Sequence, residues 1–454
     1  MVAPVEEGTK KHTRRRASDK APLIRASVAD TVKVGALVMA PTIARGVIAR
    51  RPRVVALAEG MQADLRAGRL LRRLRHRYGR GPLRLRLPGR SYVLLLSPED
   101  VRRALTESPE PFSLDNREKH AALSQFQPHG VLISRGADRA DRRAFNEEVL
   151  DTAHPVHCLS GEISRKIEGE AAELTRIIED SGELGWGEFR AAWWRVIRRV
   201  VLGDGARDDH RVSDLLTKLR MSANWSFARP RRRVLRARFQ RRLDGYLSEA
   251  EPGSLAELVA KAPKTERTDP AQQVPQWLFA YEPAGMAAFR ALALLAAHPE
   301  HMRRARREAE SGSLELPFLR ACVQESLRLW PTTPALLRES TEDTVWHGRT
   351  MPAGTGMLIF TPFLHRDDEL LPFADSFAPD IWLDGTARES WSIVPFSAGP
   401  GECPGRSLVL LSASLFLAAL LREHDFRQRA GVQPRPDRPL PRTLGPFRLR
   451  FGVV

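Results

Sequence analysis

The stretch that decides the fold is a loop of eleven residues with one cysteine, three glycines and two prolines, Phe396-Ser397-Ala398-Gly399-Pro400-Gly401-Glu402-Cys403-Pro404-Gly405-Arg406. Glycine lets a backbone turn tightly and approach a bound group, whereas proline stiffens a turn and removes an amide donor. The amides that remain in such a loop can point at sulfur. The stretch therefore predicts a loop that holds a single thiolate, that of Cys403.

A cysteine thiolate placed in this way can serve as the axial ligand of haem iron, where its electron donation favours cleavage of an O–O bond. The fixed positions of the pattern FxxGxxxCxG are filled by Phe396, Gly399, Cys403 and Gly405, and here the chain resembles the cytochrome P-450 family. The resemblance implies haem b as cofactor, with Cys403 as the iron ligand and the other three residues at the cofactor. Taken alone, the cysteine would more often be a buried structural thiol.

The resemblance also implies the fold, which is mainly α with a small β subdomain, the cytochrome P-450 fold. It covers residues 65–454, and we expect a basic disordered tail at 1–30 and a helical lead-in at 31–64 before it. Alternating residues between Leu83 and Leu96 predict two short strands that flank Pro88-Gly89. A helix capped by Ser97 should follow.

A second motif lies in the helix expected at 317–330, which contains Glu325 and Arg328. The i, i+3 spacing puts both charges on one helix face. ExxR occurs by chance in many charged helices, but its place before the cysteine loop matches the family, and the resemblance implies a structural ion pair that fixes the backbone leading to that loop. Ile381 replaces the arginine that often completes this network, so a third partner for Glu325 is left open.

Three arginines are candidates for binding the haem propionates. Arg139 and Arg143 occupy an i, i+4 pair that the family uses for this purpose, although the first is usually aromatic. Two guanidiniums on one face suit a carboxylate, and a solvated basic face is the alternative. Arg338 stands where the family often has a third such arginine, and Gly401 replaces the Arg or His that usually precedes the cysteine by two residues.

The apolar stretch 277–297 predicts a buried central helix. It resembles the family's helix over the oxygen-binding face of the haem, whose signature ends in an acid and a threonine that relay protons. Counted back from His298, the acid is Glu282 and the threonine is replaced by Pro283, and we expect both residues at the catalytic centre. Proline costs roughly 3 kcal/mol inside a helix and should kink it here.

The formal net charge of +17 implies affinity for acidic partners but does not select among nucleic acid, anionic lipid and protein. Three well separated cysteines fit a cytoplasmic protein without disulfides. The run at 34–49 is too short to span a bilayer and is expected to be a packed helix, with contact to a membrane surface as the alternative. The basic segment 229–242 has no RNA-binding signature, and we expect no nucleic-acid partner.

With these features, the resemblance implies a haem-thiolate monooxygenase that inserts one oxygen atom from O2 into a small organic substrate. No flavin module follows the haem domain in this sequence, so the electrons should come from an acidic ferredoxin and its reductase, and a monomer is expected. Pro283 keeps open a peroxide-driven oxygenase or a rearranging enzyme of the same fold. A basic binding protein without haem is the alternative of another class. The sequence does not identify the substrate.

Overall fold

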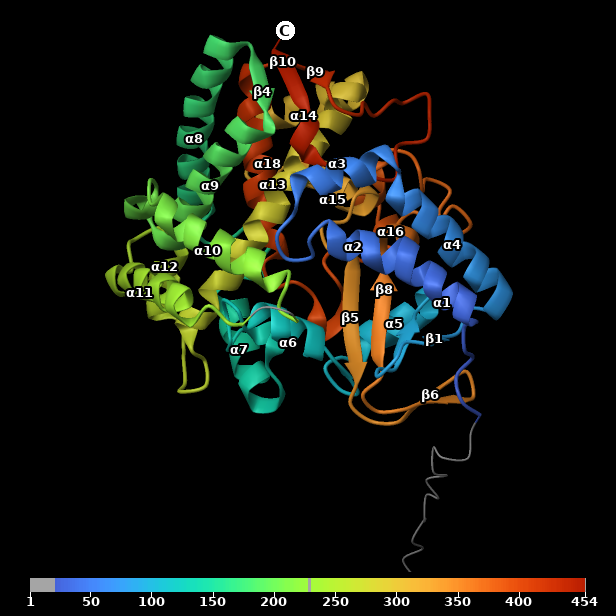
Figure 1. The fold of residues 1–454 in the computed structure, drawn as a ribbon. Coiled ribbons are helices and arrows are strands. Elements are labelled where there is room, and N and C mark those ends of the chain that lie inside the picture. Colours follow the sequence, from blue (N-terminus) through green and yellow to red (C-terminus); the bar gives the residue numbers. More distant parts are fainter. Residues whose placement is uncertain (1–20, 228–229, 454) are drawn as a thin grey trace, which may run out of the picture.

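Long helices form one side of the molecule and a five-stranded sheet forms the other (Figure 1). The computed structural model describes residues 21–227 and 230–453. Its first elements are α1 (Val28–Val34), the π-helical η2 (Gly35–Met39), α2 (Ala40–Ala44), α3 (Pro52–Gly60), α4 (Ala63–Tyr78), α5 (Pro98–Thr106), α6 (Arg117–Leu123), η3 (Val131–Ile133) and α7 (Gly136–Val149).

The remaining helices include the two that cross the centre of Figure 1, α13 and α18, which pack against each other. They are α8 (Ser160–Ser181), α9 (Trp186–Leu202), η4 (Asp204–Ala206), α10 (His210–Ala223), α11 (Arg233–Glu249), α12 (Leu255–Lys261), η5 (Pro270–Gln272), α13 (Val274–Ala297), α14 (Pro299–Glu310), α15 (Pro317–Leu329), α16 (Thr361–Leu364), η6 (Pro379–Trp382), α17 (Thr386–Glu389), η7 (Gly399–Gly401), α18 (Arg406–Glu423) and η8 (Pro446–Arg448).

The larger sheet has the strand order β1-β2-β8-β5-β3, and smaller sheets have the orders β4-β10-β9 and β6-β7. The β2–β8 pair is parallel and the other pairs are antiparallel. The strands are β1 (Leu83–Leu85), β2 (Tyr92–Leu94), β3 (Phe112–Ser113), β4 (Glu183–Gly185), β5 (Ala335–Ser340), β6 (Thr344–Trp346), β7 (Arg349–Met351), β8 (Gly356–Phe360), β9 (Phe426–Ala430) and β10 (Arg450–Val453). The strands predicted on either side of Pro88-Gly89 and the helix capped by Ser97 are confirmed.

The predicted mainly helical fold with a small sheet part is confirmed, and its core is the central helix. Helix α13 is buried around most of its circumference, as an all-round apolar sequence requires. The segment Pro270–Ala297 is long and apolar enough to cross a membrane, but 78% of its most apolar window is buried inside the protein. A core helix passes the same test of length and composition, so this segment is weak support for a membrane span.

The N-terminal lead-in packs on the sheet side of the molecule. Val34 and Val38 belong to the same hydrophobic cluster as the strands and helix α4. Residues 1–20 of the predicted basic tail lie outside the described residues. The tail was predicted to reach residue 30, but the structure contradicts its last part. The backbone of Arg25 forms a β-bridge with that of Arg84 at the edge of the sheet. Leu23 and Ala26 are buried there, because their apolar side chains complete the hydrophobic cluster.

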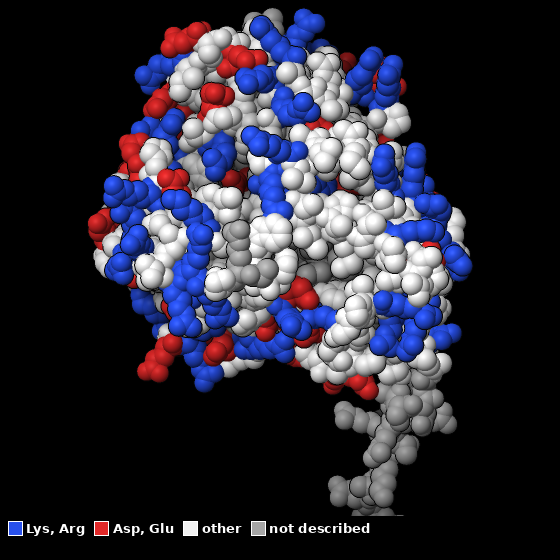
Figure 2. Space-filling view, in the orientation of Figure 1, with Lys and Arg blue, Asp and Glu red and all other residues white. Residues whose placement is uncertain are grey.

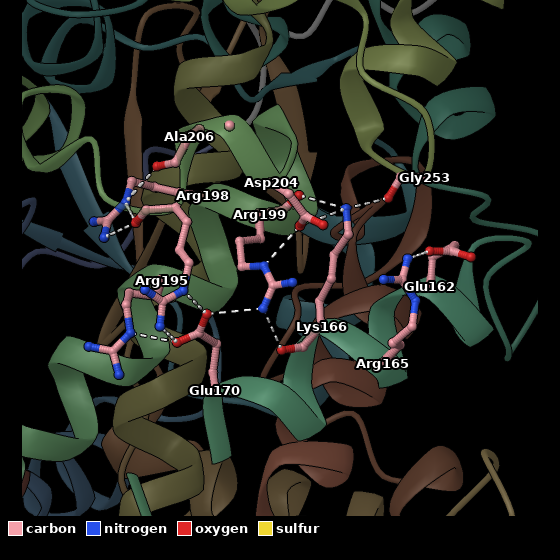
Figure 3. A network of polar contacts seen from close by, with 12 residues as sticks. Glu162, Arg165, Lys166, Glu170, Arg195, Arg198, Arg199, Asp204, Ala206 and Gly253 are labelled. Carbon is pink, nitrogen blue, oxygen red and sulfur yellow. Dashed lines mark hydrogen bonds and ion pairs between the residues drawn. The ribbon is translucent and has the colours of Figure 1, made fainter. Parts of the chain in front are cut away.

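Helices α8 and α9 are joined by a buried ionic network around Glu170 (Figure 3). The Glu170 side chain is fully buried and accepts hydrogen bonds from Arg195, Arg199 and Arg207. Beside it, the buried Lys166 donates to the carbonyls of Arg199 and Gly253. The network fixes the pair of helices that packs against α13 and α18.

Lys and Arg side chains are spread over much of the face shown in Figure 2, with fewer acidic side chains between them. The basic helix α11 buries only Phe239 and Leu243 and leaves most of its arginines in solvent. Arg229, the first residue of the basic segment 229–242, lies outside the described residues.

Candidate functional site: the cysteine loop and its cations

The cysteine loop lies between α17 and α18 and turns sharply. Ser397 and Gly399 have positive φ angles of 63° and 62°. A Cβ at Gly399 would lie 2.5 Å from the carbonyl oxygen of Leu105 in α5, so only glycine lets the loop approach this helix. The Cys403 N–H donates to the carbonyl of Phe396 over 3.0 Å and closes the loop.

The Cys403 sulfur lies in this closed loop and accepts a hydrogen bond from the Gly405 N–H. Burial raises the pKa of the Cys403 thiol, although the Gly405 N–H and the nearby Arg143 charge favour the thiolate and oppose this shift. Arg406 donates to Glu402 over 2.9 Å and to Gln324 of helix α15 over 3.2 Å. The loop is therefore tied to the helix that carries the ExxR motif.

Two buried arginines face this loop without a carboxylate partner among the described residues, Arg139 and Arg338. Arg139 donates to the carbonyl of Pro400 over 2.9 Å, and its Nε atom has no hydrogen-bond partner among the described residues. Burial, followed by the charge of Arg139, lowers the pKa of Arg338 to about 10. Desolvated cations are costly unless an anion compensates them, so this pair fits a group that carries carboxylates.

The third predicted arginine, Arg143, donates to the carbonyl of Glu402 over 2.6 Å and pairs with Glu147. Sequence reasoning missed Lys119 of α6, whose Nζ donates to the carbonyls of Leu114 and Leu337 over 3.0 Å. Burial, followed by the Arg338 charge, lowers the pKa of Lys119 well below its usual value. This lysine stands in no motif, and only the fold brings it near Arg338.

The position of the Arg338 side chain explains why residue 401 is a glycine. A Cβ at position 401 would lie 2.8 Å from Nη2 of Arg338, so the guanidinium fills the space that a side chain at 401 would need. Arg338 is held there by Ser108 Oγ over 2.9 Å and by Ser397 Oγ over 3.0 Å. The surplus positive charge at the loop fits the two propionates of a haem, with Arg139, Arg338 and Lys119 as the cations that would meet them.

The ion pair of the ExxR motif is fully buried in α15, with both side chains at 0% exposure. Arg328 donates to Glu325 over 2.8 and 2.5 Å, and its remaining N–H groups reach the carbonyls of His365, Phe373, Ala374 and Ser376. His365 in turn accepts the N–H of Val394 over 3.1 Å. Burial, followed by the Arg328 charge, lowers the pKa of His365 to about 3, so its ring is a neutral acceptor.

The missing third partner of Glu325 is Trp382. Its indole N–H donates to Oε2 of Glu325 over 3.0 Å, and the Ala378 N–H donates to Oε1 over 2.9 Å. Ile381, which replaces the usual arginine, is buried in a separate apolar cluster. The tryptophan next to the expected position therefore saturates the carboxylate.

We expect Trp382→Phe to lower the free energy of unfolding by about 2 kcal/mol, the usual range for a hydrogen bond to a charged group. Phenylalanine retains an aromatic ring, but Oε2 of the buried Glu325 carboxylate loses the hydrogen bond from the indole N–H and keeps only the one from Arg328. Urea unfolding of both proteins measures the change. Trp225→Phe, at an exposed tryptophan, is the matched control, and equal losses in the two variants would contradict the assignment.

Glu282 on the central helix is held by two arginines from neighbouring helices. Arg190 of α9 donates to it over 3.1 Å, and Arg220 of α10 contacts its other oxygen. Burial alone would raise the pKa of Glu282, but the charges and hydrogen bonds of Arg220 and Arg190 outweigh it, and the pKa is lowered. This pairing favours an ionised carboxylate at neutral pH. The catalytic roles of Glu282 and Pro283 stay predictions.

Helix α13 is continuous from Val274 to Ala297 and contains Pro283 in its interior. Two residues further on, a Cβ at Gly285 would lie 2.5 Å from the ring of Trp193, so the glycine admits this indole from α9. The Trp193 N–H donates to the carbonyl of Tyr281 over 2.8 Å, and the Tyr281 hydroxyl lies 3.4 Å from Ser412 of α18. The segment that contains Pro283 is thus fixed on both sides.

A second group of potential ligands lies outside this site. Asp151, His157 and Cys158 bring ligand atoms within 4.8 Å of one another in the loop after α7. However, the Asp151 carboxylate accepts the Cys158 N–H over 2.7 Å, and the His157 Nδ1 accepts the Leu159 N–H over 3.0 Å. These hydrogen bonds account for the cluster as a structural feature of the loop.

Comparison with known proteins shows which family this part of the chain resembles. The family model described as Cytochrome P450 matches residues 261–447, the part of the chain that contains α13, the ExxR pair and the cysteine loop. Cyclooctatin synthase of Streptomyces melanosporofaciens is 36% identical over 30% of this chain and 30% of its own length. Cytochrome P450 4c3 of Drosophila melanogaster is 32% identical over 29% of this chain and 28% of its own length. The matched segments thus span about a third or less of these relatives.

Solved structures extend the likeness to most of the fold. A retinoic acid-bound cyanobacterial CYP120A1 superposes with a TM-score of 0.67 and 18% identity, covering 84% of this chain and 94% of that one. A cytochrome P450DA haem domain gives a TM-score of 0.69 with 17% identity, covering 86% and 92%. These two structures show that the chain shares their fold. The family model, the curated relatives and the solved structures together support a member of the cytochrome P450 family, and that family uses haem b.

Proposed function

We propose that this protein is a haem-thiolate monooxygenase for a small organic substrate. The observation that carries the proposal is the closed Cys403 loop together with the surplus of buried cations around it. When bound, haem b supplies the redox chemistry that places one atom of O2 in the substrate and reduces the other to water with two electrons and two protons.

The residues of the chain then have separate tasks. Cys403 Sγ holds the iron, and the Gly405 N–H stabilises negative charge on this sulfur. Arg139, Arg338 and Lys119 bind the propionates, and Arg143 braces the loop through the Glu402 carbonyl. The buried helix α13 excludes water from the reaction, and Glu282 is the candidate for moving protons along it.

The difference spectrum of the dithionite-reduced protein with and without carbon monoxide tests this function. We expect a strongly red-shifted Soret band in the wild type, which reports thiolate ligation. Cys403→Ala should lose the band, whereas Cys158→Ser, at the exposed cysteine, should retain it. A colourless protein that binds polyanions would favour the basic binding protein instead, and a band at the position of histidine ligation would contradict Cys403 as ligand.

We further infer that the electrons come from a separate acidic ferredoxin and its reductase in the cytoplasm, with the protein acting as a monomer. The support is the net charge of +17 on the chain and the Arg406 side chain, which is 43% exposed at the end of the cysteine loop. Turnover with an acidic ferredoxin should fall steeply as salt is raised, because salt screens charge steering. Turnover driven by hydrogen peroxide is the control and should change little, and a ferredoxin-driven rate indifferent to salt contradicts the docking.

A peroxide-driven oxygenase or a rearranging enzyme of the same fold is the second candidate. It is favoured by Pro283, which has no hydroxyl to relay protons, and by the ion pairs that occupy Glu282. Turnover with hydrogen peroxide and no reductant would support the oxygenase.

We expect Pro283→Thr to change the ratio of product formed to electrons consumed while haem binding is retained. The substitution restores a hydroxyl on α13 and removes the residue that lacks a backbone donor. Product yield per NADPH in the reconstituted system measures the coupling. Loss of the haem in this variant would show that Pro283 has a structural role in α13.

A further inference from the structure

A small cavity lined by both apolar and charged side chains lies next to the segment of α13 that follows Pro283. Its volume is about 60 Å³, which is room for a small polar group rather than for a whole substrate. It is lined by α13, by the segment after α15, by the lead-in between residues 45 and 55, and by residues 443–447. Asp64 of α4 and Pro362 of α16 complete the lining, so parts of the chain that are far apart in sequence meet around the cavity.

The cavity contains a buried guanidinium with a free donor. Arg290 is 5% exposed and donates to the carbonyls of Met286 over 3.1 Å and Leu444 over 3.4 Å. Its Nη2 atom has no hydrogen-bond partner among the described residues. Burial, followed by the charge of Arg50, lowers the pKa of Arg290 to about 9.

A second arginine lines the same cavity without an anion. Arg50 donates to the carbonyls of Gly46 over 2.7 Å and Thr332 over 2.5 Å. Burial, followed by the charge of Arg45, lowers the pKa of Arg50 to about 10. Both arginines thus donate their hydrogen bonds to neutral carbonyl acceptors.

The charge of the cavity is not balanced by the residues that line it. Asp64 is the one carboxylate among the described lining residues, and both of its oxygens accept from Arg45, over 2.7 and 2.8 Å. Arg50 and Arg290 are therefore two cations in excess. A desolvated charge without a partner is costly, and a planar guanidinium fork matches a carboxylate.

We propose that Arg290 and Arg50 bind the carboxylate of an organic acid, which makes the substrate class of this protein carboxylic acids with an extended apolar body. This inference rests on the proposed function for its catalytic meaning. Arg290 lies seven residues after Pro283, about 10 Å along the helix at 1.5 Å per residue. The carboxylate held there leaves several carbons of the acid to reach the segment around Pro283.

Octanoate and 1-octanol separate the carboxylate from the apolar chain. We expect octanoate to raise the melting temperature and to bind saturably in calorimetry, and 1-octanol at equal concentration to do so much more weakly. Arg290→Gln and Arg50→Gln should each weaken octanoate binding about tenfold or more, as expected for the loss of a charge-assisted contact. Arg53→Gln removes the same charge from an exposed position of α3 and should bind octanoate like the wild type.

Arg290→Lys keeps the charge without the fork, and it replaces Arg290→Gln if that variant fails to fold. Equal binding of octanoate and 1-octanol, or full octanoate affinity in both glutamine variants, would overturn the proposal. Binding of inorganic phosphate that octanoate cannot displace would also overturn it. Octanoate-specific stabilisation of a protein that shows no haem band would keep this site and refute the proposed function, so the two failures are distinguishable.

Discussion

Glu325→Ala should give a protein that fails to hold haem and loses about 3 to 5 kcal/mol of unfolding free energy. Removing one member of a buried ion pair leaves the other charge desolvated. Arg328 would keep its carbonyl acceptors, but the N–H groups of Ala378 and Trp382 would lose theirs. We would measure haem content by the pyridine haemochrome and stability by urea unfolding.

The effect should reach the cysteine loop through a chain of contacts. Arg328 donates to the carbonyl of His365, the His365 ring accepts the Val394 N–H, and the Val394 carbonyl accepts the Ser397 N–H. Glu315→Ala removes an exposed carboxylate just before the same helix and should keep both haem and stability. Full haem occupancy in Glu325→Ala would show that this chain does not position the loop.

The parts of the fold that the sequence predicts are those whose signals are local. The alternation from Leu83 to Leu96 and the serine cap at Ser97 each lie within a few residues, and the structure has the strands and the helix there. The all-round apolar stretch 277–297 likewise becomes a core helix, α13. The tail prediction failed at its end, because the burial of Leu23 depends on a sheet edge that no local pattern reports.

The partners of the site residues could not be read from the chain, because they are distant in sequence. Trp382 reaches Glu325 across 57 positions, and Arg338 fills the space beside Gly401 from another element. The motifs predicted that each of these two networks lacks one of its usual side chains, and only the fold shows which residue takes that place. The same holds for Arg290, whose charge looks ordinary in the sequence and is exceptional only because it is buried beside Arg50.

The second large expected effect is a loss of stability when Glu170 in the ionic network between α8 and α9 is replaced (Figure 3). Burial alone would raise the pKa of Glu170, but hydrogen bonds and charges from Arg207 and Arg195 outweigh it and lower the pKa. A carboxyl whose pKa is lower in the folded than in the unfolded protein stabilises the fold above its unfolded pKa, and loses this contribution as the pH falls. At neutral pH the full contribution is therefore present.

Glu170→Gln should lower the unfolding free energy by about 3 kcal/mol at neutral pH, because three guanidiniums lose their shared carboxylate inside the protein. The difference from wild type should shrink as the pH is lowered toward and below the usual range of a glutamate, since the wild-type carboxyl then becomes protonated too. Glu179→Gln, at an exposed position of α8, is the matched control and should have little effect at any pH. Urea unfolding across a pH series measures the free energy of unfolding of both variants. A loss of unfolding free energy in Glu170→Gln that stays constant at acidic pH would contradict an ionic role, because it would indicate a loss of packing between α8 and α9 instead.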